Sequence, residues 1–382
     1  MMPMATFTTY DRARAPWNRA LVTGGAGFLG SHLCTRLLDS GVEVDCLDNL
    51  STGRAEKVAH LAGRPGFRFL ERDISEPGCA EALEGPYDLV LHLAGPASAA
   101  AWPDRPVELL DAGSLGTRVA LGLAARDGAR GLVAAQPPVW ACRGGAAAGG
   151  APRAPAPALA RAPGAGRGRA PGHGARFLLA SSPPFPPSGG DADPVGPHGA
   201  RAEAVRFAEA LVAAHAGAHG ANAGIVRLFE GYGPGMRTDD GGMPAAFIEQ
   251  ALAGRPVTVD GDGSLTHPLC YVDDMVDGVL LIAAGRSVRP VDLGGDEEPA
   301  AVEIARRVIG LTGSDSPLVF VDPPGDRPLP PRPVTGFARE IFGWLPGVSW
   351  QDGLERTVAA FRDRPEPVPT VTGEPREPAG EW

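Results

Sequence analysis

The chain of 382 residues is poor in lysine, tyrosine and cysteine. Lys57 is the only lysine among its 35 basic residues, and there are only 4 tyrosines. The 5 cysteines are scattered and form no C-x-x-C pair. This spacing excludes a disulfide framework and a cysteine metal site, and it favours buried thiols in a reducing compartment. We therefore expect a cytoplasmic protein that binds no metal.

Long apolar runs and excess positive charge are also missing. No stretch approaches the ~20 apolar residues of a membrane-spanning helix, and the N-terminus lacks the apolar core of a signal peptide. The formal net charge of −10 argues against nucleic acid or an anionic membrane as a partner. The 43% hydrophobic content is enough for one large or two moderate domains with a real core.

A glycine-rich turn follows the apolar run at residues 19–23. Gly25, Gly27 and Gly30 satisfy G-x-G-x-x-G, and Gly24, Gly27 and Gly30 also form G-x-x-G-x-x-G. Such glycines permit a tight turn, let backbone N–H groups approach a pyrophosphate, and let the following helix pack closely on the strand. The pattern alone is weak in a chain with 53 glycines, but here a predicted strand precedes it and a predicted helix follows.

Asp48 ends a second apolar run, 18 residues after Gly30. A carboxylate at this place accepts hydrogen bonds from an adenosine ribose and repels a 2′-phosphate, so it favours NAD over NADP. The alternative is an ordinary aspartate in a turn at the end of a strand. Because the glycine fingerprint lies upstream, we interpret the first 75 residues as a dinucleotide-binding unit.

Strand and helix patterns alternate from residue 19 to about 133 and again after 174. This alternation predicts right-handed βαβ units and an α/β fold with a Rossmann-type, doubly wound parallel sheet. A smaller C-terminal α/β part is expected to bind substrate. The expected organisation is a disordered leader (1–17), an NAD-binding domain (18–142 and 174–225), a disordered insertion (143–173), a mostly substrate-binding part (226–362) and a disordered tail (363–382).

The predicted insertion consists almost entirely of Ala, Gly, Pro and Arg. Without acidic or aromatic residues it cannot bury enough apolar surface to offset its ordering entropy. These residue types are also those that GC-rich codons specify in any frame, so an altered reading frame or a recent insertion is a hypothesis that resequencing would test. A solvated loop without a specific role is favoured over a nucleic-acid patch.

Several stretches are similar to the extended short-chain dehydrogenase/reductases, the NAD-dependent epimerase/dehydratase family, and within it to the UDP-glucuronate decarboxylases. The similar pieces include Leu-Val-Thr-Gly-Gly-Ala-Gly-Phe-Leu-Gly-Ser-His-Leu (21–33), Leu-Asp-Asn-Leu-Ser-Thr-Gly-Arg (47–54), Arg-Asp-Ile-Ser-Glu-Pro (72–77), His-Leu-Ala-Gly-Pro-Ala-Ser (92–98) and Cys-Tyr-Val-Asp-Asp (270–274). The resemblance implies NAD as cofactor. The residues that it implies for NAD binding are Gly24, Gly27, Phe28, Leu29, Gly30, Asp48, Asn49, Asp73, Ile74, Leu93 and Gly95.

The family's chemistry depends on a Tyr-x-x-x-Lys pair on one helix face, where the Tyr accepts a proton from the sugar hydroxyl at C4. The matching stretch here is residues 196–206, in which Arg201 stands at the Tyr position and Val205 at the Lys position. Arginine stays protonated near neutral pH and valine carries no charge, so neither replaces the missing group.

The family also has a strand that ends in a Ser/Thr-containing loop, and two stretches could correspond to it. One is residues 131–141, which places Gln136 and Pro138 at the functional positions. The other is residues 177–185, which places Ser182 and Pro184 there. The second is the better strand, and Ser182 is a weak candidate for orienting a substrate hydroxyl because no base accompanies it.

The expected UDP-sugar contacts are altered as well. By resemblance, Glu230 replaces an Asn that contacts the nucleotide-sugar, and His267 replaces an Arg that pairs with phosphate. Arg332 keeps its phosphate-binding place, although the acidic residue expected two positions later is Val334. Together these changes indicate relaxed constraint on the pocket.

Three hypotheses follow. The chain is an NAD-dependent nucleotide-sugar enzyme like UDP-glucuronate decarboxylase, acting on UDP-glucuronate with impaired catalysis. Alternatively it is a UDP-sugar 4-epimerase or dehydratase, or a catalytically inactive NAD-binding paralogue. The resemblance also implies a homodimer through the helices near 106–126 and 202–214, with the arginine on the second helix as a departure from the family.

Overall fold

The computed structural model describes residues 15–95, 105–129, 175–183, 197–238, 242–322 and 332–363. Most of the expected leader, the expected insertion at 143–173 and nearly all of the expected tail lie outside the described residues. So does the alternative loop at residues 131–141.

A seven-stranded sheet forms the centre, and all of its neighbouring strands run parallel. Its strand order is β10-β6-β5-β4-β1-β2-β3. The strands are β1 (Arg19–Thr23), β2 (Glu43–Asp48), β3 (Phe67–Glu71), β4 (Leu89–His92), β5 (Arg176–Ser181), β6 (Ala223–Leu228) and β10 (Val291–Leu293). The predicted doubly wound parallel sheet is therefore confirmed.

Alternate residues of the central strands enter two separate hydrophobic cores. Val22 and Leu178 join the core on one face, whereas Leu21, Phe177 and Leu179 join the core on the other. Side chains of a strand point to opposite faces in turn, so a strand that is apolar at every position must be covered on both sides. This explains why the short runs at residues 20–22 and 89–91 are apolar throughout.

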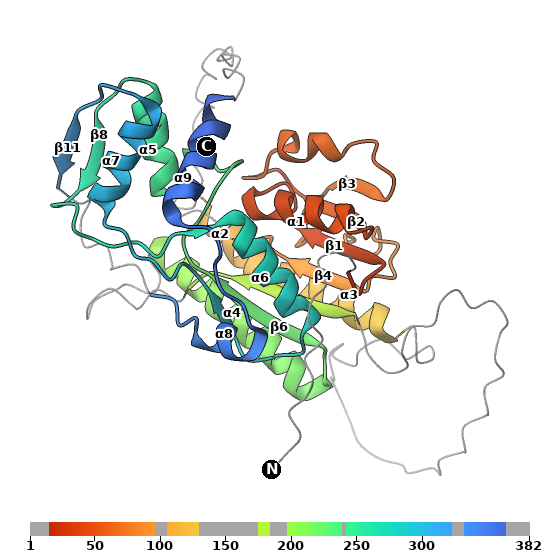
Figure 1. Cartoon of the computed structure of the whole chain (residues 1–382). Coiled ribbons are helices and arrows are strands. Elements are labelled where there is room, and N and C mark those ends of the chain that lie inside the picture. The colour runs from red at the N-terminus through yellow and green to blue at the C-terminus, as the bar shows by residue number, and fades with distance from the viewer. Residues whose placement is uncertain are drawn as a thin grey trace, which may run out of the picture.

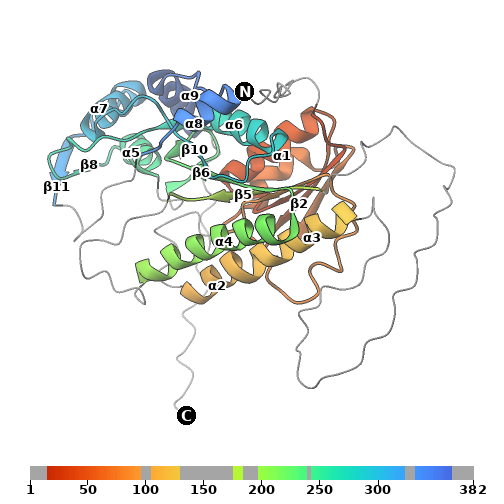
Figure 2. The ribbon, with the colours of Figure 1, turned by 90° about the horizontal axis from the view of Figure 1, so that it is seen from below.

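Helices cover both faces of the sheet (Figures 1 and 2). One face carries α1 (Phe28–Asp39) and α6 (Val272–Ala284), which also contact each other. The other carries α3 (Thr117–Ala129) and the long α4 (Pro197–His219), with α2 (Pro106–Asp111) packed on α4. Figure 2 shows α2, α3 and α4 running together below the sheet.

The helix expected over residues 106–126 contains a π-helical segment, Ala112–Gly116, between α2 and α3. Two glycines allow this segment to lie close to its neighbours. A Cβ atom on Gly113 would lie 2.9 Å from the Cβ of Ala204 in α4, and one on Gly116 would lie 2.9 Å from Ile74. The spacing of the apolar residues predicted a helix, but it did not predict the wider π-helical turn within it.

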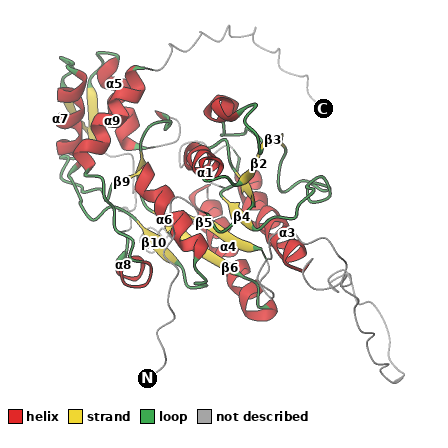
Figure 3. Ribbon diagram, turned by 45° about the vertical axis from the view of Figure 1, so that its right-hand side comes forward, coloured by secondary structure: helices red, strands yellow, loops and turns green. Residues whose placement is uncertain are grey.

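The remaining elements form a smaller part beyond β6, at the upper left of Figure 1. In it α5, α7 and α9 pack together beside a two-stranded parallel sheet, β8 with β11, and Figure 3 shows this group apart from the main sheet. Its elements are α5 (Met243–Leu252), β8 (Val257–Asp260), α7 (Ala301–Thr312), β11 (Leu318–Val321) and α9 (Trp350–Arg362). A further short sheet pairs β7 (Gly231–Tyr232) with β9 (Cys270–Tyr271), and α8 (Gly336–Phe342) lies beside β10.

The range expected to be mostly substrate-binding, 226–362, is thus divided between the two parts. It supplies the end of β6 and all of β10 to the main sheet, α6 to the helical layer and α8 beside β10, whereas α5, β8, α7, β11 and α9 form the smaller part. Among the described residues, no helix has the length and apolar content needed to cross a membrane. Nor do these residues hold a cluster of three or more His, Cys, Asp or Glu side chains that could bind a metal ion.

Candidate functional site

The site lies at the carboxyl ends of β1 and β4, where the strand order of the sheet reverses. In open α/β sheets ligands bind in the crevice outside this point. Gly24 begins the turn after β1 with φ +68°, a conformation that favours glycine. A Cβ atom on Gly24 would lie 2.8 Å from the backbone of Leu93 and Ala94 at the end of β4. The turn therefore closes against the neighbouring strand.

Gly30 explains how α1 packs over this turn. A Cβ atom on Gly30 would overlap the carbonyl oxygen of Gly24, so only glycine fits. The helix starts at Phe28 after Gly27, and no side chain caps its first turn. Its N–H groups therefore point into the crevice, where an anion such as a pyrophosphate is stabilised. Leu29 is buried behind the turn.

Asp48 ends β2 and lies almost fully buried beside the glycine turn. Its two carboxylate oxygens accept hydrogen bonds of 2.9 Å from the N–H groups of Ala26 and Leu50. Burial raises the pKa of Asp48, and these hydrogen bonds oppose the rise. Each oxygen keeps a second acceptor direction, so the carboxylate can still bind ribose hydroxyls. A Cβ atom on Gly53 would overlap the Asp48 carboxylate, so only glycine fits at position 53.

Asn49 and Asp73 lie together at the ends of β2 and β3. The Asn49 amide donates to Asp73 at 2.7 Å, and the Ser75 backbone N–H donates to the same carboxylate at 2.7 Å. Burial favours a higher pKa for Asp73, but the hydrogen bonds outweigh it and lower the pKa. Ile74 is buried beneath Asp73. The residues predicted for the adenosine end are therefore brought together.

The end of β4 contains a buried histidine that sequence reasoning did not single out. His92 Nδ1 lies 2.7 Å from the Thr23 hydroxyl, and His92 Nε2 lies 3.2 Å from the Thr117 hydroxyl. Burial lowers the pKa of His92 to about 4, so the ring is neutral near pH 7. Leu93 follows directly, and its N–H donates to the Thr23 carbonyl at 3.0 Å, which holds this segment against the end of β1. Gly95 lies two residues further along the chain. The only signal in the sequence was a polar residue inside an apolar strand.

Ser182 and Arg201 meet at the end of β5. The Arg201 guanidinium, on the first turns of α4, donates to the Ser182 hydroxyl over 3.5 Å. Both side chains are partly buried, and burial lowers the pKa of Arg201. Val205 lies one helical turn later on the same face of α4. Residues predicted from separate motifs are thus neighbours, and the group beside Ser182 is a guanidinium.

A hydrogen-bonded network beside this contact links β5, α4 and β6. The Ser181 hydroxyl donates to Glu209 at 2.8 Å, and the Arg227 guanidinium holds the same carboxylate through two hydrogen bonds of 2.8 and 2.6 Å. The hydrogen bonds to Glu209 raise the pKa of Arg227. Because Ser181 and Arg227 are register partners, the network fixes the strand ends under Ser182. Neither Glu209 nor Arg227 was among the predicted site residues.

Glu230 and His267 form a pair, although each was expected to contact the nucleotide-sugar. His267 Nδ1 lies 2.9 and 3.1 Å from the two carboxylate oxygens of Glu230. Glu230 has φ +36°, an unusual conformation for a residue other than glycine. The two unexpected residues therefore satisfy each other across the gap between β6 and the segment before β9.

Arg332 lies beside this pair, held by Glu298 and Thr266. Its guanidinium is 3.2 Å from the Glu298 carboxylate and 3.4 Å from the Thr266 hydroxyl, which also donates to Glu298 at 3.3 Å. Thr266 precedes His267 in the chain, so the segment before β9 supplies one partner to Glu230 and another to Arg332. Arg332 is mostly exposed, and it can turn toward an anionic ligand.

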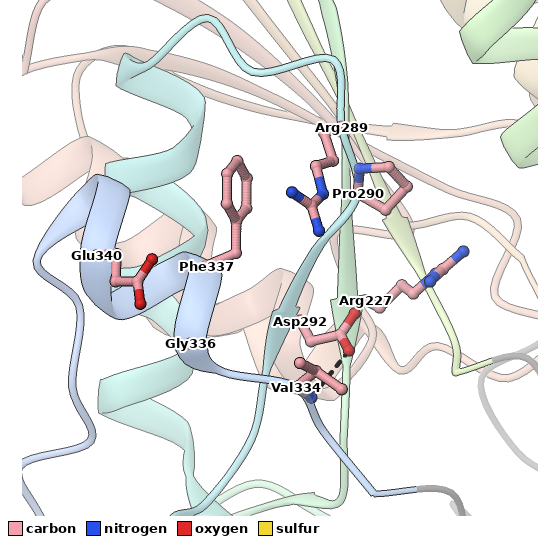
Figure 4. Close-up of a pocket in the computed structure, with 8 residues that line it drawn as sticks. All are labelled: Arg227, Arg289, Pro290, Asp292, Val334, Gly336, Phe337 and Glu340. Atoms are coloured by element: carbon pink, nitrogen blue, oxygen red, sulfur yellow. Dashed lines mark hydrogen bonds between the residues drawn. The ribbon is translucent and has the colours of Figure 1, made fainter. Parts of the chain in front are cut away.

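A separate cavity of about 470 Å³ opens at the sheet edge, between β10 and α8 (Figure 4). Arg289 lies over the Phe337 ring, 4.6 Å from its centre, and the Val334 N–H donates to Asp292 at 3.0 Å. Figure 4 shows Arg289 directed between Phe337 and Asp292. Arg227 also lines this cavity, so it connects the cavity with the network under Ser182.

Comparison with known proteins agrees with this geometry. The model of the "NAD dependent epimerase/dehydratase family" matches residues 20–137 and 165–293. The chain belongs to this family. The match covers the glycine turn, Asp48 and the strands that bear Ser182 and Glu230.

Two relatives from this family are named UDP-glucuronic acid decarboxylases. The Xenopus tropicalis protein is 33% identical over 344 residues, which cover 90% of this chain and 72% of the relative. An Arabidopsis thaliana protein is 33% identical over 350 residues, which cover 91% and 90%. A dTDP-glucose 4,6-dehydratase from Streptomyces venezuelae, solved with NAD bound, superposes with a TM-score of 0.70 at 24% identity, covering 90% of this chain and 97% of that one. At this identity the structure supports the fold alone.

Proposed function

We propose that the chain binds NAD and a UDP-sugar as an impaired relative of the UDP-glucuronate decarboxylases. The glycine turn, the uncapped start of α1 and the Asp48 carboxylate support binding of the dinucleotide. The pairing of Asn49 with Asp73 and the position of Leu93 and Gly95 support the same assignment. The relatives named for UDP-glucuronate support the substrate class.

One contact carries the proposed impairment. Arg201, which the resemblance assigns to the position of the family's proton acceptor, donates to Ser182. Bound NAD would supply hydride acceptance and return at the sugar. The chain itself must remove the hydroxyl proton, and a guanidinium cannot accept it near neutral pH. Ser182 can orient a hydroxyl, but its own proton has no base beside it among the described contacts.

The sugar-nucleotide end is expected to bind weakly but specifically. Arg332 supplies a cation for the diphosphate, whereas the Glu230 carboxylate adds a negative charge nearby. His267 Nδ1 lies 2.9 Å from that carboxylate, so the carboxylate already has a partner within the chain. We therefore expect the Glu230–His267 pair to change the UDP-sugar site without abolishing it.

A turnover assay tests the proposal. The purified protein is incubated with NAD and carboxyl-labelled UDP-glucuronate, and released CO₂ is measured alongside coenzyme binding by calorimetry. We expect coenzyme binding with CO₂ release at least ~10³-fold below a family enzyme, because general base catalysis typically contributes 10²–10⁴-fold. Release at family rates would disprove the impairment, and loss of coenzyme binding would disprove the function itself.

A double substitution provides the matched gain-of-function experiment. Arg201→Tyr with Val205→Lys restores the expected pair on one face of α4, and we expect CO₂ release to rise by about 10²-fold. The control is Arg206→Tyr with Val205→Lys, because Arg206 lies on the exposed side of the helix. Equal activity in both double variants would show that the position of the new tyrosine is irrelevant.

An inactive NAD-binding paralogue is the alternative that the residue chemistry supports most directly. This alternative predicts the same coenzyme binding, and it differs only in predicting no turnover with any UDP-sugar. A UDP-sugar 4-epimerase or dehydratase would need the same missing proton acceptor. Measuring turnover of UDP-glucose beside UDP-glucuronate distinguishes the inactive paralogue, the epimerase or dehydratase, and the decarboxylase.

We also propose a homodimer through α2 and α4. Large apolar side chains are exposed on these helices and on the π-helical segment: Val107, Leu110, Leu115 and Phe207. A two-fold axis would let this face cover the same face of a second copy, with helices packed against helices. The face lies opposite the smaller part of the chain (Figure 2).

A further inference from the structure

The carboxyl edge of the sheet presents its candidate coenzyme contacts in spatial order. Asp48 ends β2, Gly24 follows β1, Leu93 follows β4 and Ser182 follows β5, and these four strands are consecutive neighbours. Three strand spacings separate β2 from β5, about 14 Å. If the proposed function holds, adenosine lies at Asp48 and the pyrophosphate at the glycine turn. The nicotinamide end then extends toward β5.

Arg201 places a positive charge at that end of the row. Its guanidinium contacts the Ser182 hydroxyl and is partly buried between α4 and β5. A guanidinium remains charged at neutral pH even where burial opposes its charge. Val205, one turn along the helix, adds no charge of its own. The side chain that replaced the proton acceptor is therefore a fixed cation.

Such a cation distinguishes the two redox states of the coenzyme. The nicotinamide ring of NAD⁺ carries a positive charge, whereas the dihydronicotinamide ring of NADH is neutral. Charges in a partly buried crevice are screened less than charges in water, so a neighbouring guanidinium disfavours the oxidised ring. The adenosine and pyrophosphate contacts are the same in both states and do not contribute to the difference.

We infer that this chain binds NADH in preference to NAD⁺ and that Arg201 is the residue that sets this preference. Reduction of NAD⁺ consumes two electrons and one proton, so tighter binding of NADH raises the potential of the bound couple. Each tenfold ratio of the two affinities corresponds to ~30 mV for a two-electron couple. Occupancy of the crevice would then respond to the cellular ratio of NADH to NAD⁺.

Titration of the full-length chain with NAD⁺ and with NADH, each followed by calorimetry, tests this inference. We expect NADH to bind at least about tenfold more tightly, which corresponds to ~1.4 kcal/mol. Arg201→Gln should lower the affinity ratio by about tenfold, chiefly by strengthening NAD⁺ binding, because the substitution removes the charge and keeps a polar side chain.

Two further variants separate charge from fold. Arg201→Lys keeps the charge and should keep the preference. Arg206→Gln, on the exposed side of α4 where Arg206 pairs with Glu203, should leave both affinities unchanged. The inference would be overturned if Arg201→Gln had the same affinity ratio as the unsubstituted chain. It would also be overturned if the unsubstituted chain bound NAD⁺ more tightly than NADH. Failure to bind either coenzyme would overturn the proposed function as well.

Discussion

Single residues in the crevice show how neighbouring positions compensate for one another. The sequence predicts that Glu230 and His267 each depart from the family's pattern, and their side chains lie 2.9 Å apart and satisfy each other. Arg201 similarly donates a hydrogen bond to the Ser182 hydroxyl. A polar side chain that lost such a partner in a partly buried site would cost about 1–3 kcal/mol. Changes that look independent in the sequence are therefore coupled in space.

His92 gives a prediction at the same scale. Its pKa falls from an ordinary 6.5 to about 4 on folding, because burial penalises the charged ring. Between these two values the unfolded chain binds more protons than the folded chain, so stability rises with pH across this window. The contribution of His92 should make the chain about 2 kcal/mol less stable at pH 5 than at pH 7.

Urea unfolding at both pH values measures this difference. His92→Asn should reduce the pH dependence by a similar amount, even if the variant is less stable at every pH. An unchanged slope in the variant would assign the pH dependence to other groups. Asp48 cannot produce the same trend, because its raised pKa makes the folded chain bind protons more readily as the pH falls.

At the scale of elements, close approach between backbones decides which glycines matter. Gly24 and Gly30 join the first strand, its turn and α1 through contacts that leave no space for a methyl group. Gly113 does the same for the π-helical segment against α4. Several glycines in the described part of the chain, among them Gly41, Gly122 and Gly310, lack such a contact. The number of glycines therefore does not locate the site, whereas the close contacts of Gly24 and Gly30 identify the turn that shapes the crevice.

A pair of glycine substitutions tests this distinction. Gly30→Ala would drive a methyl group into the Gly24 carbonyl, and we expect a loss of about 2 kcal/mol or more in unfolding free energy together with loss of coenzyme binding. Gly122→Ala in α3 meets no atom within 4 Å and should stabilise the chain by about 0.5–1 kcal/mol. Thermal and urea unfolding measure both. Equal effects would contradict the proposed packing.

At the scale of the whole molecule, the apolar face of α2 and α4 makes a prediction about assembly. Light scattering should give twice the 39.3 kDa mass of one chain. Leu110→Glu combined with Phe207→Glu places charges on the face and should give monomers, because charged residues are disfavoured at the centre of an interface. Leu345→Glu changes an equally exposed residue outside this face and should leave the dimer intact. A monomeric unsubstituted chain would disprove the homodimer.

The candidate coenzyme contacts nearest the glycine turn could be named from the sequence because they are local. Gly24 to Gly30 form one turn and helix start, and Asp48 ends the next strand, so spacing alone places them together. The parallel sheet followed in the same way from the alternation of apolar strands and helices. These features depend on short stretches of chain whose patterns have few structural solutions.

Only the tertiary structure revealed which distant side chains meet. Arg201 and Ser182 are 19 residues apart, Glu230 and His267 are 37 apart, and His92 contacts hydroxyls from β1 and α3. The addition of β10 to the main sheet, and of α6 to the helical layer that covers it, was likewise invisible, because strand order depends on long-range pairing. Local periodicity determines the elements and their turns, whereas the charge pairs of the crevice arise only when packing brings separate segments together.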